Sequence, residues 1–189
     1  MAARGTALVL SSGTVAFDLV GELGPISSGG VPLGGEPAIS HVLRGLDGWN
    51  VVASLRAEDD LLAESVRRTA PSACLLAGDP SVGLGEACLT ALDAIDLNGE
   101  LLVVFGDTIV KAPPPPDVIV VRPPLDTERW TTAERDPTGR LVFRDKLTSD
   151  QPADACVGVF AFRDGVAFRE SLRTSVNADR PGAFYDAIE

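Results

Sequence analysis

An acidic residue, Asp107, follows one of the most apolar stretches of the sequence. Residues 101–105 read LLVVF, and Gly106 separates them from Asp107. In open α/β sheets, ligands gather at the carboxyl ends of the strands, and a glycine there lets the chain bend and a ligand approach closely. Asp107 is therefore a candidate ligand for a metal ion or a ribose. The alternative is that its carboxylate caps a local turn, with Thr108 as its partner.

A second candidate is the loop that follows the first apolar segment of the chain. Residues 6–12 read TALVLSS, and Gly13 comes next. Turns rich in serine and glycine present backbone N–H groups to phosphates, so Ser11, Ser12 and Gly13 are candidate phosphate-binding residues. The serines lack a surrounding Gly-x-Ser-x-Gly elbow, which argues against a serine hydrolase.

The elements that must position these residues alternate along the first half of the chain. Short apolar runs predict strands at 6–12, 50–55, 72–78 and 101–105. Apolar residues at helical spacing lie between these runs and predict helices within 36–48, 58–70 and 83–95. Strands that alternate with helices predict a three-layer α/β domain, in which a mainly parallel sheet is covered on both faces.

The pattern changes after residue 110. Four prolines at 113–116 predict a stiff extended connector rather than a helix. Beyond them, strands are predicted in 117–124, 130–147 and 155–162, the second range being a hairpin turned at 136–139, and helices are predicted from about 166 and about 181. The parallel half therefore carries a mixed or antiparallel extension, and the whole chain of residues 1–189 is predicted to form a single domain.

Composition excludes several function classes. Sixteen basic and 27 acidic residues give a formal net charge of −11, which disfavours nucleic acid and anionic lipid as partners. Every apolar run is too short to span a bilayer, and the first residues favour a strand over a signal peptide, so we expect a cytoplasmic protein that does not contact a membrane. Three widely spaced cysteines in apolar surroundings indicate buried thiols rather than a disulfide framework or a zinc site.

Two consecutive segments carry a resemblance to a known family. GLGEACLTALDAI, residues 83–95, followed by LLVVFGDTIV, resembles the central signature of the sugar-phosphate nucleotidyltransferases, which have a GT-A-like, Rossmann-related fold. The resemblance implies that Gly83, Leu84 and Ala87 approach the nucleotide base at a helix start. It also implies that Asp107 binds Mg²⁺.

Weaker similarities lie on either side, in the order in which the family has them. Residues 29–46 are similar to the family's Pro-Leu-x-Gly-x-Pro-x-Ile stretch. Asp145 and Lys146 stand where the family has a Glu-Lys-Pro that contacts the sugar phosphate, and Gly158 stands where a glycine packs against the sugar. The resemblance therefore implies a nucleotide-binding half at 1–110 and a sugar-phosphate-binding half at 117–189.

The chemistry implied by the resemblance is transfer of a nucleotidyl group from a nucleoside triphosphate to a sugar 1-phosphate, with release of pyrophosphate. Such a protein need only align the reacting groups and neutralise charge, with Mg²⁺ as the cofactor. The partners are then these two small molecules, and self-association as a homo-oligomer is left open. No residue is assigned as catalytic.

The sequence departs from the family pattern in the first loop and at its end. The loop lacks the family's Arg and Lys, and Ser28 stands near the place of the Lys. Gly78 replaces a base-reading Gln, and the second metal-binding Asp, which follows a Trp in the family, is missing before the chain stops at Glu189. Either the chain is part of a longer protein or the metal site is incomplete. The alternative function is therefore a catalytically inactive domain that acts as a ligand-binding, regulatory or assembly module.

Overall fold

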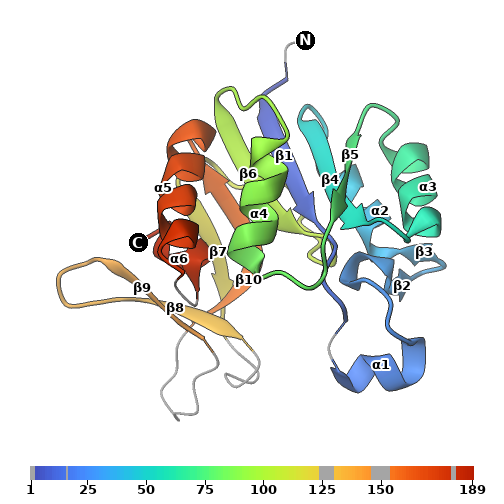
Figure 1. The fold of residues 1–189 in the computed structure, drawn as a ribbon, viewed down its shortest axis with the longest axis horizontal. Helices are drawn as coiled ribbons and strands as arrows, with labels where there is room; N and C mark the ends of the chain where they lie inside the picture. The colour runs from blue at the N-terminus through green and yellow to red at the C-terminus, as the bar shows by residue number, and fades with distance from the viewer. Residues whose placement is uncertain (1–2, 16, 124–129, 146–153, 180–181) are drawn as a thin grey trace.

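A computed structural model of the chain describes residues 3–15, 17–123, 130–145, 154–179 and 182–189. One eight-stranded sheet runs through the molecule and lies between two layers of helices (Figure 1). This arrangement confirms the predicted three-layer α/β architecture. Both halves of the chain contribute strands to this one sheet.

The sheet has a parallel part and an antiparallel part. Its strands are β1 (Gly5–Leu10), β4 (Asn50–Arg56), β5 (Cys74–Gly78), β6 (Glu100–Phe105), β7 (Val118–Arg122), β8 (Thr131–Arg135), β9 (Leu141–Asp145) and β10 (Asp154–Phe162). The spatial order is β5-β4-β1-β6-β10-β8-β9, with β7 paired to β10. Pairing is parallel from β5 to β6 and antiparallel from β10 onward, which confirms the mixed extension predicted for the second half.

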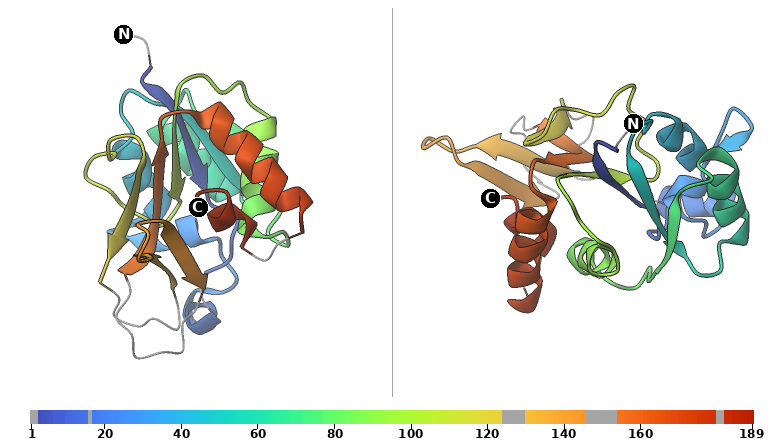
Figure 2. Two further views of the ribbon diagram at one scale, coloured as in Figure 1. Left: turned by 90° about the vertical axis from the view of Figure 1, so that its left-hand side faces the viewer. Right: turned by 90° about the horizontal axis from the view of Figure 1, so that it is seen from above.

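Helices cover both faces of the sheet. They are α2 (Ala38–Arg44) and α3 (Asp60–Thr69) on one face, and α4 (Leu84–Asp93), α5 (Gly165–Asn177) and α6 (Ala183–Asp186) on the other (Figure 2). Successive side chains of β1 point to opposite faces, so Val9 packs with α2 and α3 while Leu8 packs with α4 and α5. Burial on both faces explains why this strand reads as a continuous apolar run.

The segment between β1 and α2 holds elements that the sequence pattern did not predict. They are α1 (Phe17–Leu23), the short 3₁₀ helix η1 (Ser28–Gly30), and the two-residue strands β2 (Pro32–Leu33) and β3 (Glu36–Pro37). Each is shorter than the stretch over which apolar periodicity can be recognised. The prediction for 36–48 also ran too far, since α2 ends at Arg44 and Gly48, with φ of 82°, lies in the turn beyond it.

None of the helices in the described ranges is long and apolar enough to cross a membrane. Of the three cysteines, Cys88 and Cys156 are buried as expected, but Cys74 is exposed. The prediction was wrong for Cys74 because β5 is the edge strand of the sheet.

Candidate functional site

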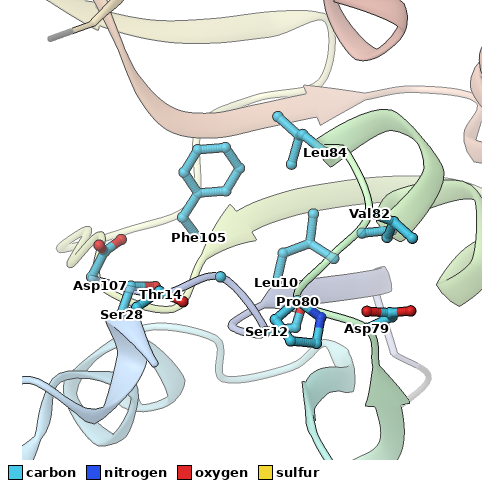
Figure 3. A pocket seen from close by; sticks show the side chains of 12 residues that line it. Leu10, Ser12, Thr14, Ser28, Asp79, Pro80, Val82, Leu84, Phe105 and Asp107 are labelled. Atoms are coloured by element: carbon cyan, nitrogen blue, oxygen red, sulfur yellow. The ribbon is translucent and has the colours of Figure 1, made fainter. Parts of the chain in front are cut away.

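A pocket of about 320 Å³ opens where the parallel strands end (Figure 3). Its lining comes from the ends of β1 and β6, the loops after β1, β5 and β6, the short helix η1 and the start of α4. A pocket at the carboxyl ends of parallel strands is the usual ligand site of open α/β folds, and this volume lies in the range of small-molecule pockets. The pocket brings together the segments that the sequence indicated separately, which are the loop after β1, the start of α4 and the loop after β6.

Strand register explains why the loops after β1 and β6 meet. Leu10 pairs with Phe105 in the parallel β1–β6 ladder, and the Gly106 N–H donates to the Leu10 carbonyl at 2.8 Å. Ser12 and Asp107 each stand two residues beyond this pair, so both leave the sheet at the same edge. Both line the pocket.

Only some residues of the loop after β1 line the pocket, and one supports it from behind. Ser11 is 1% exposed, and its hydroxyl accepts a hydrogen bond from the Gly29 N–H at 3.2 Å. Ser12 and Gly13 line the pocket. Sequence reasoning grouped the three residues together, whereas the structure places Ser11 behind the lining, where it anchors the segment that follows α1.

The start of α4 forms the apolar wall. Leu84 lines the pocket together with Phe105 and Leu10 (Figure 3). Ala87, one turn further along α4, lines it as well. Gly83 is the N-cap residue of α4 and lines a separate recess beside α6. Two of the three residues that the resemblance assigned to the base therefore lie in the pocket, and the third precedes them in the chain.

Asp107 is exposed, and within the described ranges its carboxylate has only one weak partner outside its own residue. The Thr108 hydroxyl lies 3.5 Å from Asp107 Oδ1 but 2.8 Å from the Val157 carbonyl oxygen. A hydroxyl donates only one hydrogen, so the shorter contact takes it, and the turn-capping alternative for Asp107 is not favoured. The surrounding protein reduces hydration of the charged form and raises the pKa of Asp107, against the smaller opposing effects of its own backbone N–H and the Thr108 hydroxyl.

A second carboxylate, Asp79, lines the same pocket and was missed by sequence reasoning. It lies at the opposite end from Asp107, which is grouped with Thr14 and Ser28 (Figure 3). The Ser81 hydroxyl and backbone N–H donate to Asp79 Oδ1 at 2.6 and 2.7 Å, and these bonds lower the pKa of Asp79. Among the described residues that line the pocket there are two carboxylates and no lysine or arginine.

The pocket suits a magnesium ion only if the substrate supplies most of the ligands. No group of three or more acidic, histidine or cysteine side chains gathers as a metal site anywhere in the described ranges. Mg²⁺ is commonly held by one or two carboxylates together with waters and substrate phosphates. The Asp107 carboxylate, which has few partners of its own, fits this set of ligands.

The residues predicted to meet the sugar phosphate are only partly described. Asp145 ends β9, where its backbone pairs with Thr131, and Lys146 lies outside the described residues. Gly158 has φ of 80° at an irregular point of β10, and a Cβ atom there would come within 2.3 Å of Phe105 Cδ2. Gly158 therefore touches the pocket wall through Phe105 rather than lining the pocket itself.

One cation near the pocket was also missed. Arg56, at the end of β4, donates hydrogen bonds to Ser12 and Thr14, which both line the pocket. The available signal was the same one that identified Asp107, a charged residue directly after an apolar strand.

The single histidine and the two tryptophans of the chain lie in different surroundings. The Nε2 atom of His41 lies 3.0 Å from the Leu33 carbonyl oxygen, a contact that gives this histidine a structural role. Trp49 is buried, with Arg4 stacked 5.0 Å from its ring centre, whereas Trp130 is exposed.

Comparison with known proteins bears on the fold that carries this site. The bifunctional protein GlmU of Leifsonia xyli is 43% identical over 81 residues, which is 40% of this chain but only 17% of the length of that protein. A putative glucose-1-phosphate thymidylyltransferase from Bacillus anthracis has a TM-score of 0.67 at 15% identity, covering 95% of this chain and 77% of that one. The inositol-1-phosphate CTP transferase of T. maritima has a TM-score of 0.66 at 16% identity, covering 92% of this chain and 74% of that one. No protein-family model matches the chain.

The two solved structures share the layout described above over nearly the whole chain, although their sequences have diverged widely from it. The sequence match to GlmU adds a relative detected independently of the structure. The resemblance seen in the sequence is thereby confirmed: the chain has the fold of the nucleotidyltransferases.

Proposed function

We propose that the chain is a sugar-phosphate nucleotidyltransferase domain. The observation that carries the proposal is the pocket itself, which brings the loop after β1, the start of α4 and Asp107 around one cavity. The named activities of the two solved structures support the same chemical class, since both are named as transferases of a nucleotide group to a phosphorylated small molecule.

The reaction would need little covalent chemistry from the protein. An oxygen of the sugar 1-phosphate attacks the α-phosphorus of the nucleoside triphosphate, and the bond from that phosphorus to the bridging oxygen breaks. Pyrophosphate leaves with the electron pair. Positioning and charge neutralisation are the main contributions expected of the protein in such a transfer.

Each end of the pocket has a role under this proposal. The apolar wall that contains Leu84, Ala87 and Phe105 suits a flat nucleotide base, and the loop at Ser12 and Gly13 would donate to phosphate oxygens. Asp107 would hold Mg²⁺, which when bound supplies positive charge to the phosphates. Asp145, Lys146 and Gly158 remain the residues proposed to serve the sugar phosphate.

The absence of lysine and arginine from the described lining favours a second candidate. A domain that binds a nucleotide without turning it over would keep the pocket and dispense with the charges that stabilise leaving pyrophosphate. Such a domain would act as a binding, regulatory or assembly module. It differs from the enzyme in an observable way, because it binds nucleotide and releases no pyrophosphate.

Calorimetric titration of the purified chain with the four nucleoside triphosphates, each with and without magnesium, tests the proposal. We expect one of them to bind, and to bind more tightly with magnesium, because two carboxylates in the pocket repel a bare triphosphate. A screen of sugar 1-phosphates for pyrophosphate release then separates the enzyme from the binding module. A folded sample that binds no triphosphate contradicts both.

Placing a lysine at Ser28 is expected to strengthen triphosphate binding. Ser28 lines the pocket beside Thr14 and Asp107, near the position at which the family resemblance places a lysine (Figure 3). A positive charge a few ångströms from the phosphates should raise the affinity roughly tenfold, after its competition with Asp107 is allowed for. Calorimetry on Ser28→Lys measures this.

The matched control is Ser72→Lys, which adds the same charge at an exposed serine beyond the other end of β5. Equal effects of the two substitutions would show that only the net charge of the chain matters. Weaker binding by Ser28→Lys would contradict the placement of the phosphates at this end of the pocket.

A further inference from the structure

The guanidinium of Arg56 holds three points of the segment that follows β1. Its Nε donates to the Ser12 carbonyl at 2.9 Å, Nη1 to the Pro25 carbonyl at 2.9 Å, and Nη2 to the Thr14 hydroxyl oxygen at 2.5 Å. The β1–β4 register, which pairs Leu10 with Ser54, brings Arg56 level with Ser12. A cation 42 to 44 residues away in the sequence therefore shapes the loop that lines the pocket.

Arg56 keeps its positive charge uncompensated within the described part of the chain. All three of its acceptors are neutral oxygens, and none of the ion pairs formed there includes Arg56. Arg44, by contrast, pairs with Glu36 at 2.6 Å. An unpaired guanidinium directly behind the lining adds positive potential on the side of the pocket that also carries Asp107.

The contacts of Arg56 also set the direction of two pocket donors. Thr14 Oγ1 accepts from Arg56, so the hydrogen of the Thr14 hydroxyl is free to donate elsewhere, and Thr14 lines the pocket. In a trans peptide the carbonyl and the next N–H point in opposite directions. Holding the Ser12 carbonyl toward Arg56 therefore turns the Gly13 N–H away from Arg56, and Gly13 also lines the pocket.

We propose that Arg56 is the positioning residue of a phosphate-binding loop at Ser12–Thr14. It orients the Thr14 hydroxyl and the Gly13 N–H toward phosphate oxygens and transmits its charge to them through the Thr14 hydroxyl. A donor polarised by a cation makes a stronger bond to an anion than an unassisted one. In this chain an indirect cation behind the loop thus stands in for a lysine or arginine in the pocket lining. The inference rests on the proposed function, because it names how that site meets the phosphates.

The test compares a nucleoside triphosphate with its nucleoside, both titrated by calorimetry into the 189-residue chain. Arg56→Ala is expected to weaken triphosphate binding about tenfold and to leave nucleoside binding unchanged, because only the triphosphate meets the loop. Arg56→Lys keeps the charge but not the forked geometry, and we expect it to restore part of the loss. Arg67→Ala removes the same charge from an exposed position of α3 and should bind both ligands as the parent does.

Thr14 provides a second route if Arg56→Ala fails to fold. Thr14→Val removes the hydroxyl at nearly constant shape and should weaken triphosphate binding to a similar degree, whereas Thr14→Ser should retain it. Where both variants fold, combining Arg56→Ala with Thr14→Val should cost less than the product of the two single losses, since both interrupt one chain of contacts.

The outcomes separate this inference from the function on which it rests. If the parent binds triphosphate and Arg56→Ala binds it equally well, or loses triphosphate and nucleoside in parallel, the positioning role is overturned and the function stands. If the parent binds no triphosphate, the function and the inference are both overturned.

Discussion

Replacing Asp107 with asparagine is expected to lower the affinity for a nucleoside triphosphate in the presence of magnesium on the order of a hundredfold. Without magnesium the affinity should stay the same or rise. The loss with magnesium is expected because, among the described residues, the only partner of the Asp107 carboxylate outside its own residue lies at 3.5 Å, so its oxygens are available to the ion, and an amide is a far poorer ligand for Mg²⁺. Calorimetric titration with and without magnesium measures the difference.

Asp79→Asn is the matched control for this substitution. It removes the same charge from the same pocket, and the amide oxygen can still accept the two hydrogen bonds from Ser81. We expect Asp79→Asn to bind magnesium–triphosphate at least as tightly as the parent, because the pocket becomes less negative. Equal losses in the two variants would argue against a specific metal ligand at Asp107.

Gly158→Ala is expected to lower the free energy of unfolding by about 3 kcal/mol, the sum of backbone strain and crowding in a packed region. Gly158 has φ of 80°, a conformation that residues with a Cβ rarely adopt, and its Cβ would come within 2.3 Å of Phe105 Cδ2. The Phe105 ring must then move, and this ring forms part of the pocket wall. Urea denaturation of parent and variant measures the loss.

Gly139→Ala separates the two causes. Gly139 has φ of 86° in the turn between β8 and β9, but no described heavy atom beyond its two chain neighbours lies within 4 Å of the position of its Cβ, so only the backbone strain of about 1 kcal/mol remains. Combining Gly158→Ala with Phe105→Ala should cost less than the sum of the single changes, because the clash is removed. If Gly158→Ala lowered the free energy of unfolding no more than Gly139→Ala, the Phe105 ring would move aside without cost.

Much of the fold follows from local patterns in the sequence. Apolar runs and helical periodicity indicate which side chains are buried. Buried positions repeat with the period of the strand or helix to which they belong, so the pattern identifies the element. The strands at β1, β4, β5 and β6 and the helices between them were predictable for this reason. Short elements such as α1 were not, because seven residues with a glycine give no clear period.

The candidate site was predictable where a residue's place depends on its own strand. Asp107 follows β6, so its position at the carboxyl end of the strand comes from the element itself, whereas Leu84 and Ala87 at the start of α4 were identified through the family resemblance. Asp79 follows β5 in the same way but carried no resemblance to draw attention to it. One rule, a polar residue directly after a parallel strand, identifies both carboxylates of the lining.

The sequence by itself thus determined the alternation of strands and helices, the parallel sheet, and a strand-end carboxylate at Asp107. Only the tertiary structure decided that Arg56 holds the loop at Ser12, that Ser11 supports the pocket without lining it, and that Gly158 makes room for Phe105. The physical reason is that periodicity records how deeply a residue is buried but not against which neighbour. Partners 44 or 53 residues apart become neighbours only through the order and register of strands in the sheet.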